Sequence, residues 1–359
     1  MIKLLDWYII KKYLGTFVFT LSIFTVIIVV FDISERLDDF LRHQAPIDKI
    51  FLNYYAGVVP FYLNMLAPLI NFIAVIFFTA KMADQTEIVP ILSGGVSFNR
   101  FLRPYWISAF VIFLVSLVAN LYIIPKTNRL KNDFENVYVN PKSDNSKLRI
   151  HMQMDKQTFV SIENFDNNEK VGFKFTLEKF KGFELTEKLV ADRIAWDSVK
   201  RVWQLDNFSI RTVNGLQEKM TYGIKKDTTL DMRPADFEIY ENIFDNMDMR
   251  TLNDRIQKEE IRGTGIMSDL LLQKYKRFVN PVAIFILTLI GVSLSSRKVR
   301  GGVGLPLGIG IFLSFAYIVC NQFSTMFALK GGLPPLLAVL LPNVVFGLLG
   351  LYLMAKAPK

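Results

Sequence analysis

The sequence has few of the residues that build disulfides and metal centres. Its 359 residues include one cysteine, Cys320, and two histidines, His43 and His151. A single cysteine excludes an intramolecular disulfide. The histidines have no cysteine or histidine partner at the short spacing of zinc ligands, so we expect no metal site.

Catalytic and nucleotide-binding motifs are also missing. Glycine pairs occur at 94–95, 301–302 and 331–332, but none continues into the Lys-Ser or Lys-Thr that ends a P-loop. The motifs HExxH, GxSxG and CxxC do not occur, and adjacent acids such as Glu259 and Glu260 are typical of a solvated helix face. We therefore expect a protein that is not an enzyme and that binds no cofactor itself.

Acidic and basic residues are absent from six long stretches of the chain. Each stretch reaches the roughly 18–20 residues with which a helix crosses about 30 Å of hydrocarbon, and a backbone in lipid must satisfy its own hydrogen bonds, which favours helices. Proton- and ion-coupled transporters usually carry charges inside such spans, so the composition argues against a self-sufficient secondary transporter. The stretches are Tyr13–Phe31, Phe51–Ala80, Pro104–Pro125, Phe278–Ser296, Gly301–Leu329 and Gly331–Ala355.

The basic residues predict how these spans are oriented. The net charge is +9, and most basic residues outside the large middle segment fall in alternate connections. Because cytoplasmic loops are enriched in Lys and Arg, we expect both termini and residues 80–97 in the cytoplasm. The start, LLDWYIIKKY, is interpreted as a short interfacial helix rather than part of a cleaved signal peptide. The cytoplasmic set is Lys3, Lys11, Lys12, Lys81, Arg100, Arg103, Arg297, Lys298, Arg300, Lys356 and Lys359; the opposite set is Arg36, Arg42, Lys49 and Lys330.

The middle segment, residues 126–250, changes to short alternating stretches separated by turn signals such as DNNE and NG. Such a pattern is typical of an all-β sandwich or barrel. Helical periodicity returns from Leu252 to Lys276 and runs into the fourth span. We therefore expect a membrane half at 1–125, an outer β domain at 126–250, and a connecting helix with a second membrane half at 251–359. The residues expected in the β core are Phe175, Trp196, Trp203 and Phe208.

A short polar stretch, AKMADQTEIVPILSGGVS at 80–97, separates the second and third spans. It predicts a brief amphipathic helix over about 83–94 that starts at Asp84 and ends at the glycine pair. A helix lying on a lipid surface should be basic on its polar face. This one is acidic, which favours docking in a groove on another protein. The residues expected at that contact are Glu87, Ile88, Ile91 and Leu92.

Several segments resemble the LptF/LptG family of lipopolysaccharide export permeases. Glu87 followed by an apolar run and Gly95-Val96-Ser97 resembles that family's coupling helix. NPVAIFILTLIGVSL with RGGVGLPLGIGIFLSFAY resembles its fourth and fifth spans, and GGLPPLLAVLLPNVVFGLLGLYL resembles its last span. AWDSVKRVWQLDNFSI resembles paired strands of its outer domain. The order and spacing agree over nearly the whole chain.

The resemblance implies a fold and a mechanism. The fold would be six transmembrane helices with an extracytoplasmic β-jellyroll-like domain between the third and fourth. The chain would pair with a second LptF/LptG-like permease, and an LptB-like ATPase dimer, using ATP and Mg, would dock on the coupling helices. Lipopolysaccharide would leave the inner membrane of a Gram-negative bacterium through the periplasmic β domain, towards LptC-like and LptA-like jellyroll proteins.

Lipid contacts are expected at the first and fifth spans. Arg36 and Arg42 are candidates for lipid phosphates, because guanidinium groups bind phosphate bidentately. The neighbouring acids, Glu35, Asp38 and Asp39, equally indicate an ordinary interfacial charge cluster. Candidates for an acyl-chain cavity are Phe24, Phe31 and Phe315, although phenylalanines that face lipid or pack between helices would look the same.

An alternative of a different class remains open at this stage. A membrane receptor or mechanotransmission protein could carry the same spans and use the β domain as a sensor, without moving lipid. The two hypotheses differ in whether an ATPase and a second six-span protein stay bound to the chain.

Overall fold

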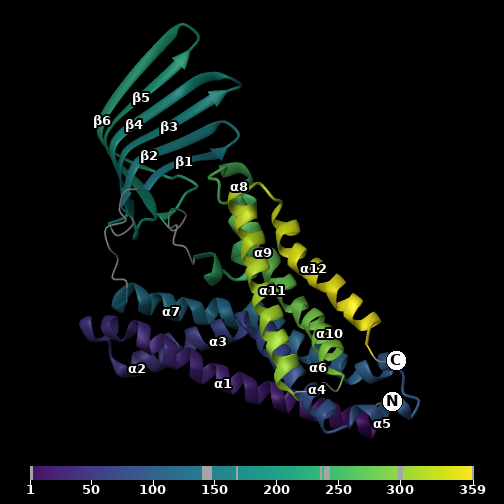
Figure 1. Cartoon of the computed structure of the whole chain (residues 1–359). Helices are drawn as coiled ribbons and strands as arrows, with labels where there is room; N and C mark the ends of the chain where they lie inside the picture. The colour runs from purple at the N-terminus through teal and green to yellow at the C-terminus, as the bar shows by residue number, and fades with distance from the viewer. Residues whose placement is uncertain are drawn as a thin grey trace. The chain divides into compact units, whose positions relative to one another are not determined.

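The computed structural model describes residues 3–139, 148–166, 169–234, 237, 243–297 and 302–357. Six of the described helices are long and apolar enough to cross a membrane, and in the sequence the strands of a β-sheet come between the third and the fourth of them (Figure 1). The predicted fold class is therefore confirmed. The cytoplasmic charges predicted at Lys298, Arg300 and Lys359 lie outside the described residues. The candidate spans are Leu4–Arg42, Ala67–Asp84, Phe98–Tyr138, Met267–Ser295, Gly304–Lys330 and Pro335–Ala355.

The chain divides into two compact units, which are described separately. The membrane unit comprises residues 1–139 and 271–359, and the β unit comprises residues 140–270.

The first half of the membrane unit begins with one uninterrupted helix. The segment predicted as an interfacial helix is the start of α1, whose 39 residues would measure roughly 58 Å. This length exceeds the hydrocarbon core, so α1 must extend into an interfacial region. The helices of this half are α1 (Leu4–Arg42), α2 (Ile47–Lys49), the π-helical turn η1 (Ile50–Tyr55), α3 (Ala56–Met65), α4 (Ala67–Asp84), α5 (Ile88–Ser93), α6 (Phe98–Val118), the π-helical turn η2 (Ala119–Ile123) and α7 (Ile124–Tyr138).

The second apolar stretch differs from the single helix expected over 51–80. It is divided into η1, α3 and α4, with a break at Leu66. Pro68 lies in the first turn of α4. Proline is tolerated there because its missing N–H would have no partner within the helix. Only α4 of these pieces is long enough to be a candidate span.

The second half of the membrane unit packs around α4 and α10. Gly291 of α10 lies so close to Val75 and Phe72 that an added Cβ would come within 2.9 Å of Val75. A buried cluster that includes Phe72, Ile76, Leu287 and Tyr317 joins α4, α10 and α11. The helices are α9 (Met267–Val279, its first turn in the β unit), the 3-10 turn η5 (Asn280–Val282) around Pro281, α10 (Ala283–Ser295), α11 (Gly304–Lys330) and α12 (Pro335–Ala355).

The described strands of the β unit form one antiparallel sheet in which sequence neighbours are also spatial neighbours (Figure 1). Short turns join most of them, and Gly182 and Gly215, both with positive φ, lie in the β3–β4 and β5–β6 turns. The strands are β1 (Leu148–Asp155), β2 (Thr158–Asp166), β3 (Val171–Lys181), β4 (Glu184–Asp197), β5 (Val202–Asn214) and β6 (Gln217–Thr228). They are followed by a 3-10 turn, η4 (Ile243–Asn246), and by α8 (Met249–Arg262).

The alternation of buried and exposed side chains changes phase along one line across the sheet. One row of paired residues is Ile162, Phe175, Ala191 and Phe208; the next inward row is Phe165, Gly172, Ile194 and Leu205. The two rows are three residues apart in each of these four strands, whereas strict alternation would make them two apart. Lys174 and Asn207 lie at this step with φ of 53° and 48°. In β3 and β5, therefore, a residue with left-handed backbone lies at the point where the alternation of buried and exposed side chains shifts by one residue.

The β core contains the aromatic residues that the sequence indicated. Phe175 and Trp203 are fully buried, and Trp196 and Phe208 are partly buried against the same cluster. The indole N–H of Trp203 donates to the backbone oxygen of Met232, at 2.9 Å. This bond satisfies the one polar atom that a buried tryptophan brings into a core.

Candidate coupling site

The coupling segment, defined here as residues 85–97, connects α4 to α6. Thr86 has a φ of 57°, which interrupts the helical backbone between α4 and α5. The helix expected over about 83–94 is therefore shorter: Asp84 is the last residue of α4, and α5 begins at Ile88. A threonine in the left-handed region is unusual because it carries a branched Cβ. Two glycines then end α5, and Gly95 has a φ of 84°.

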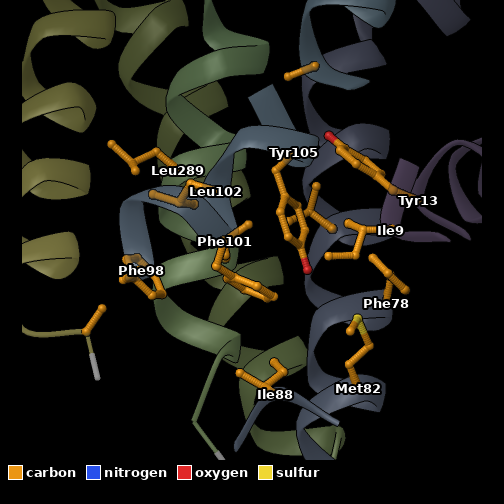
Figure 2. Close-up of a cluster of buried hydrophobic side chains, with 14 of the residues drawn as sticks. Ile9, Tyr13, Phe78, Met82, Ile88, Phe98, Phe101, Leu102, Tyr105 and Leu289 are labelled. Atoms are coloured by element: carbon orange, nitrogen blue, oxygen red, sulfur yellow. The ribbon is translucent and has the colours of Figure 1, made fainter. Parts of the chain in front are cut away.

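The apolar side of α5 faces its own chain. Ile88 is 1% exposed and packs in a core with Met82 and Phe98 (Figure 2). Ile91 and Leu92, which were predicted with Ile88 as docking contacts, are partly buried against that core. In this structure Ile88 offers no surface to a second protein. Val89 and Pro90 of α5 are exposed instead, Val89 at 59%, and neither was among the predicted contacts.

Glu87 lies just before α5, and the start of α1 contacts it. The hydroxyl of Tyr8 donates to Glu87, with its oxygen 3.0 Å from Oε2 and 3.2 Å from Oε1. Lys12 Nζ lies 3.9 Å from Glu87 Oε1 and also bonds to the Tyr8 hydroxyl. The Glu87 side chain keeps 33% exposure, so its carboxylate is oriented and still open to solvent.

A second pair joins α1 to the helix that follows the segment. Arg100 in the first turn of α6 donates to both carboxylate oxygens of Asp6, and each contact measures 2.7 Å. Asp6 is 5% exposed and also accepts the backbone N–H of Lys3 at 2.8 Å. Arg100 is one of the basic residues expected in the cytoplasm. Its partner is 94 residues away in sequence, and no local pattern indicates it.

Uncharged polar side chains join three spans next to these contacts, beginning at Tyr13, which follows Lys12 in α1. The Tyr13 hydroxyl donates to Asn71 Oδ1 at 2.6 Å, and Asn71 Nδ2 donates to Thr288 Oγ1 at 2.9 Å. The three residues come from α1, α4 and α10. Hydrogen bonds between buried polar groups are favoured in this setting because such groups would otherwise be unsatisfied.

The residues expected at lipid lie in two different environments. Arg36 is half-buried, and the carboxylates of Asp32 and Glu135 are close enough to interact with its charge. Arg42, in the last turn of α1, is exposed. Lipid-phosphate contact by either residue stays a prediction, and for Arg36 the nearby acids compete with a phosphate.

The three phenylalanine candidates also stay predictions. Phe31 in α1 is 70% exposed and Phe315 in α11 is 67% exposed, whereas Phe24 is half-buried. Large exposed apolar side chains along α1 and α11 suit contact with acyl chains or with another membrane helix.

Asp32 is a functional candidate that the apolar runs did not reveal, since it directly follows the first run. It is 9% exposed, and the Tyr54 hydroxyl donates to its Oδ1 at 3.0 Å. Its other oxygen, Oδ2, has no hydrogen-bond partner among the described atoms. A buried acid at the end of a span is unusual enough to indicate a role.

Two comparisons place these features beside known proteins. The family model described as "Lipopolysaccharide export system permease LptF/LptG" matches residues 7–356. The lipopolysaccharide export system permease protein LptG of Escherichia coli strain K12 is 18% identical over 357 residues, covering 97% of this chain and 98% of that protein. The LptG of Escherichia coli O6:H1 strain CFT073 matches with the same identity and coverage.

Proposed function

The chain belongs to the LptF/LptG family of lipopolysaccharide export permeases, and from this premise we propose that it is a non-catalytic permease subunit of an ATP-driven exporter. It would take lipopolysaccharide from the inner membrane and pass it to the β unit. The observation that carries the proposal is the family match over residues 7–356, in a chain whose sequence has no P-loop. The energy would then come from a separate ATPase subunit that binds ATP and Mg.

The coupling segment supports the ATPase part of the proposal. It is a short element between two spans, and it presents the oriented carboxylate of Glu87 beside the exposed Val89. We propose that an LptB-like ATPase dimer docks on this surface. Glu87 would be the charged contact, Val89 would add apolar contact, and Ile91 and Leu92 would contribute at their partly exposed edges.

The remaining partners follow from the membrane and β units. In the most apolar 18-residue stretch of α1 only 6% of the residues are buried within the chain, and in the corresponding stretch of α11 only 22% are buried. These helices therefore have surface available for a second LptF/LptG-like permease and for lipid. The β unit would deliver the lipid to LptC-like and LptA-like periplasmic jellyroll proteins, with both termini of the chain in the cytoplasm.

The first experiment is to identify what stays bound to the tagged chain. The chain would be expressed in its native cell and extracted in a mild detergent, and the bound molecules identified by mass spectrometry. We expect a P-loop ATPase, a second six-span protein and lipopolysaccharide. A lone chain, in a detergent that keeps other ABC complexes intact, would contradict the proposal and favour the receptor.

The second experiment tests Glu87 itself. Glu87→Ala should lower ATPase association and lipid release in the reconstituted complex, while the β unit still folds. Asp84→Ala is the matched control, because Asp84 is an exposed acid three residues earlier. Equal release by the Glu87→Ala complex and the unmodified one would remove Glu87 from the coupling role.

A further inference from the structure

The first turns of α1 are attached to the coupling segment on both sides of α5. Before α5, Glu87 accepts the Tyr8 hydroxyl at 3.0 Å, with Lys12 Nζ 3.9 Å away. After α5, Arg100 bonds to both oxygens of Asp6 at 2.7 Å. Two separate contacts therefore flank the element that an ATPase would move.

The geometry of the second contact resists sliding and rotation. A bidentate pair between guanidinium and carboxylate fixes the relative plane of the two groups as well as their distance. Asp6 is 5% exposed, so water has little access to compete for its oxygens. The backbone N–H of Lys3, the residue just before α1, donates to the same carboxylate.

Apolar packing continues the same attachment. Ile9, one turn after Asp6, is 1% exposed and belongs to the core that contains Ile88 of α5 and Met82 of α4 (Figure 2). The start of α1, the end of α4 and α5 thus share one close-packed cluster. Close-packed side chains transmit displacement because they have few voids into which to relax.

The rest of α1 is held much less. Tyr13, at the end of this anchored part, is buried and bonds to Asn71 of α4. Of the most apolar 18-residue stretch of α1 only 6% is buried, and towards the other end of the helix Asp32 and Phe40 make contacts again. A helix that is anchored at its start and largely free along its length moves as a lever when the anchor moves. A movement of the coupling segment would therefore displace the start of α1 and, with it, the whole helix.

We propose that Asp6, Tyr8 and Arg100 are positioning residues of the coupling site. They hold the start of α1 and the coupling segment as one rigid body, so that a displacement of the segment by the ATPase carries α1 with it. Tyr8 also orients the Glu87 carboxylate towards its docking partner. This inference rests on the proposed function, because it needs an ATPase that moves the segment.

Distances in the complete complex test the rigid body directly. Spin labels would be attached at Lys11→Cys and Ser93→Cys, both exposed positions, in a Cys320→Ser background. We expect the same distance between the labels in the nucleotide-free and the vanadate-trapped complex. With Arg100→Gln added, we expect the two states to differ. A distance that changes without this substitution, or that stays constant in both proteins, would overturn the inference.

Lipid released per ATP hydrolysed gives the functional readout. Arg100→Gln and Asp6→Asn should lower this ratio by about tenfold, the size expected when a hydrogen-bonded charge pair worth about 1.4 kcal/mol is lost. The KM for ATP should not change. The control is Arg103→Gln, which removes an exposed arginine one turn along the same helix and should leave the ratio unchanged.

A milder variant covers the case in which the charge variants do not assemble. Tyr8→Phe removes one hydroxyl from a side chain that is 38% exposed, so the fold should persist. We expect the release ratio to fall by roughly threefold, within the range for the net contribution of a typical single hydrogen bond. An unchanged ratio in an assembled Tyr8→Phe complex would overturn the positioning role while leaving the proposed function intact. If the unmodified chain neither retains an ATPase nor releases lipid, the proposed function itself fails.

Discussion

Gly57 shows how closely two helices of the membrane unit approach each other. A Cβ at this position of α3 would lie 2.6 Å from the backbone oxygen of Thr127 and 2.6 Å from Lys131 Cβ, both in α7. Neither atom is the end of a flexible side chain, so the helices would have to separate. The residue is a glycine because the packing leaves no room for a side chain.

Gly57→Ala should therefore destabilise the membrane unit by about 1–3 kcal/mol, the usual cost of overpacking a well-packed core. The midpoint of thermal unfolding in detergent would show it as a lower temperature. Gly15→Ala is the matched control, since nothing lies within 4 Å of a Cβ added at that position of α1. Equal midpoints for the two variants would show that α3 and α7 adjust without cost.

Ile88 and Val89 illustrate what a single-residue assignment from sequence can miss. The apolar pattern of the coupling segment indicated that some of its residues are buried, but not whether the buried side faces this chain or a partner. The structure places Ile88 in the core of this chain and leaves Val89 exposed. The choice depends on Met82 and Phe98, which come from elements on either side of α5.

At the scale of elements, the phase step of the β-sheet is already visible in the sequence. Four strands contain an apolar residue, two other residues and a second apolar residue or glycine: IENF, GFKF, ADRI and LDNF. These spacings of three interrupt the period-two alternation within the strands. In β3 and β5 the step contains a residue in the left-handed region, Lys174 and Asn207, and Asn tolerates that region better than most residues.

Asn207 allows this to be tested within one strand. Asn207→Val should destabilise the sheet by about 1–2 kcal/mol, because a β-branched residue is strained in the left-handed region. Asn207→Gly should be tolerated, since glycine adopts positive φ without that cost. Hydrogen exchange of the β4 and β5 amides in the full chain would measure the difference. Equal protection in the two variants would show that backbone conformation at the step is not what limits the sheet.

The second apolar stretch is an element that sequence pattern resolved only in part. Its composition correctly indicated a span, but the number of helical pieces depended on Leu66, where the backbone leaves regular helix, and on Pro68. Proline has no N–H to complete the preceding helix. Hydropathy is an average over many residues and is insensitive to such single-residue effects. It therefore indicated that a span lies in this stretch, but not that α4 begins at Ala67.

At the scale of the whole molecule, the orientation across the membrane is the prediction with the widest consequences. In a Cys320→Ser background, Leu216→Cys at the fully exposed β5–β6 turn should react with a membrane-impermeant maleimide added from the periplasmic side. Ser93→Cys should react only after the inner membrane is opened. The physical reason is the excess of Lys and Arg in the connections assigned to the cytoplasm. The opposite labelling pattern would place the coupling segment outside and remove the ATPase from the mechanism.

The sequence by itself determined the properties that are local along the chain. Uncharged runs indicated six spans, alternation indicated an inserted β domain, and the order of both resembled one permease family over nearly the full length. Tertiary structure alone decided which side chains meet: Tyr8 with Glu87 across 79 residues, and Arg100 with Asp6 across 94. Span length and periodicity depend on neighbouring residues, whereas such contacts depend on how distant helices pack. The link between α1 and the coupling segment is therefore a property of the fold.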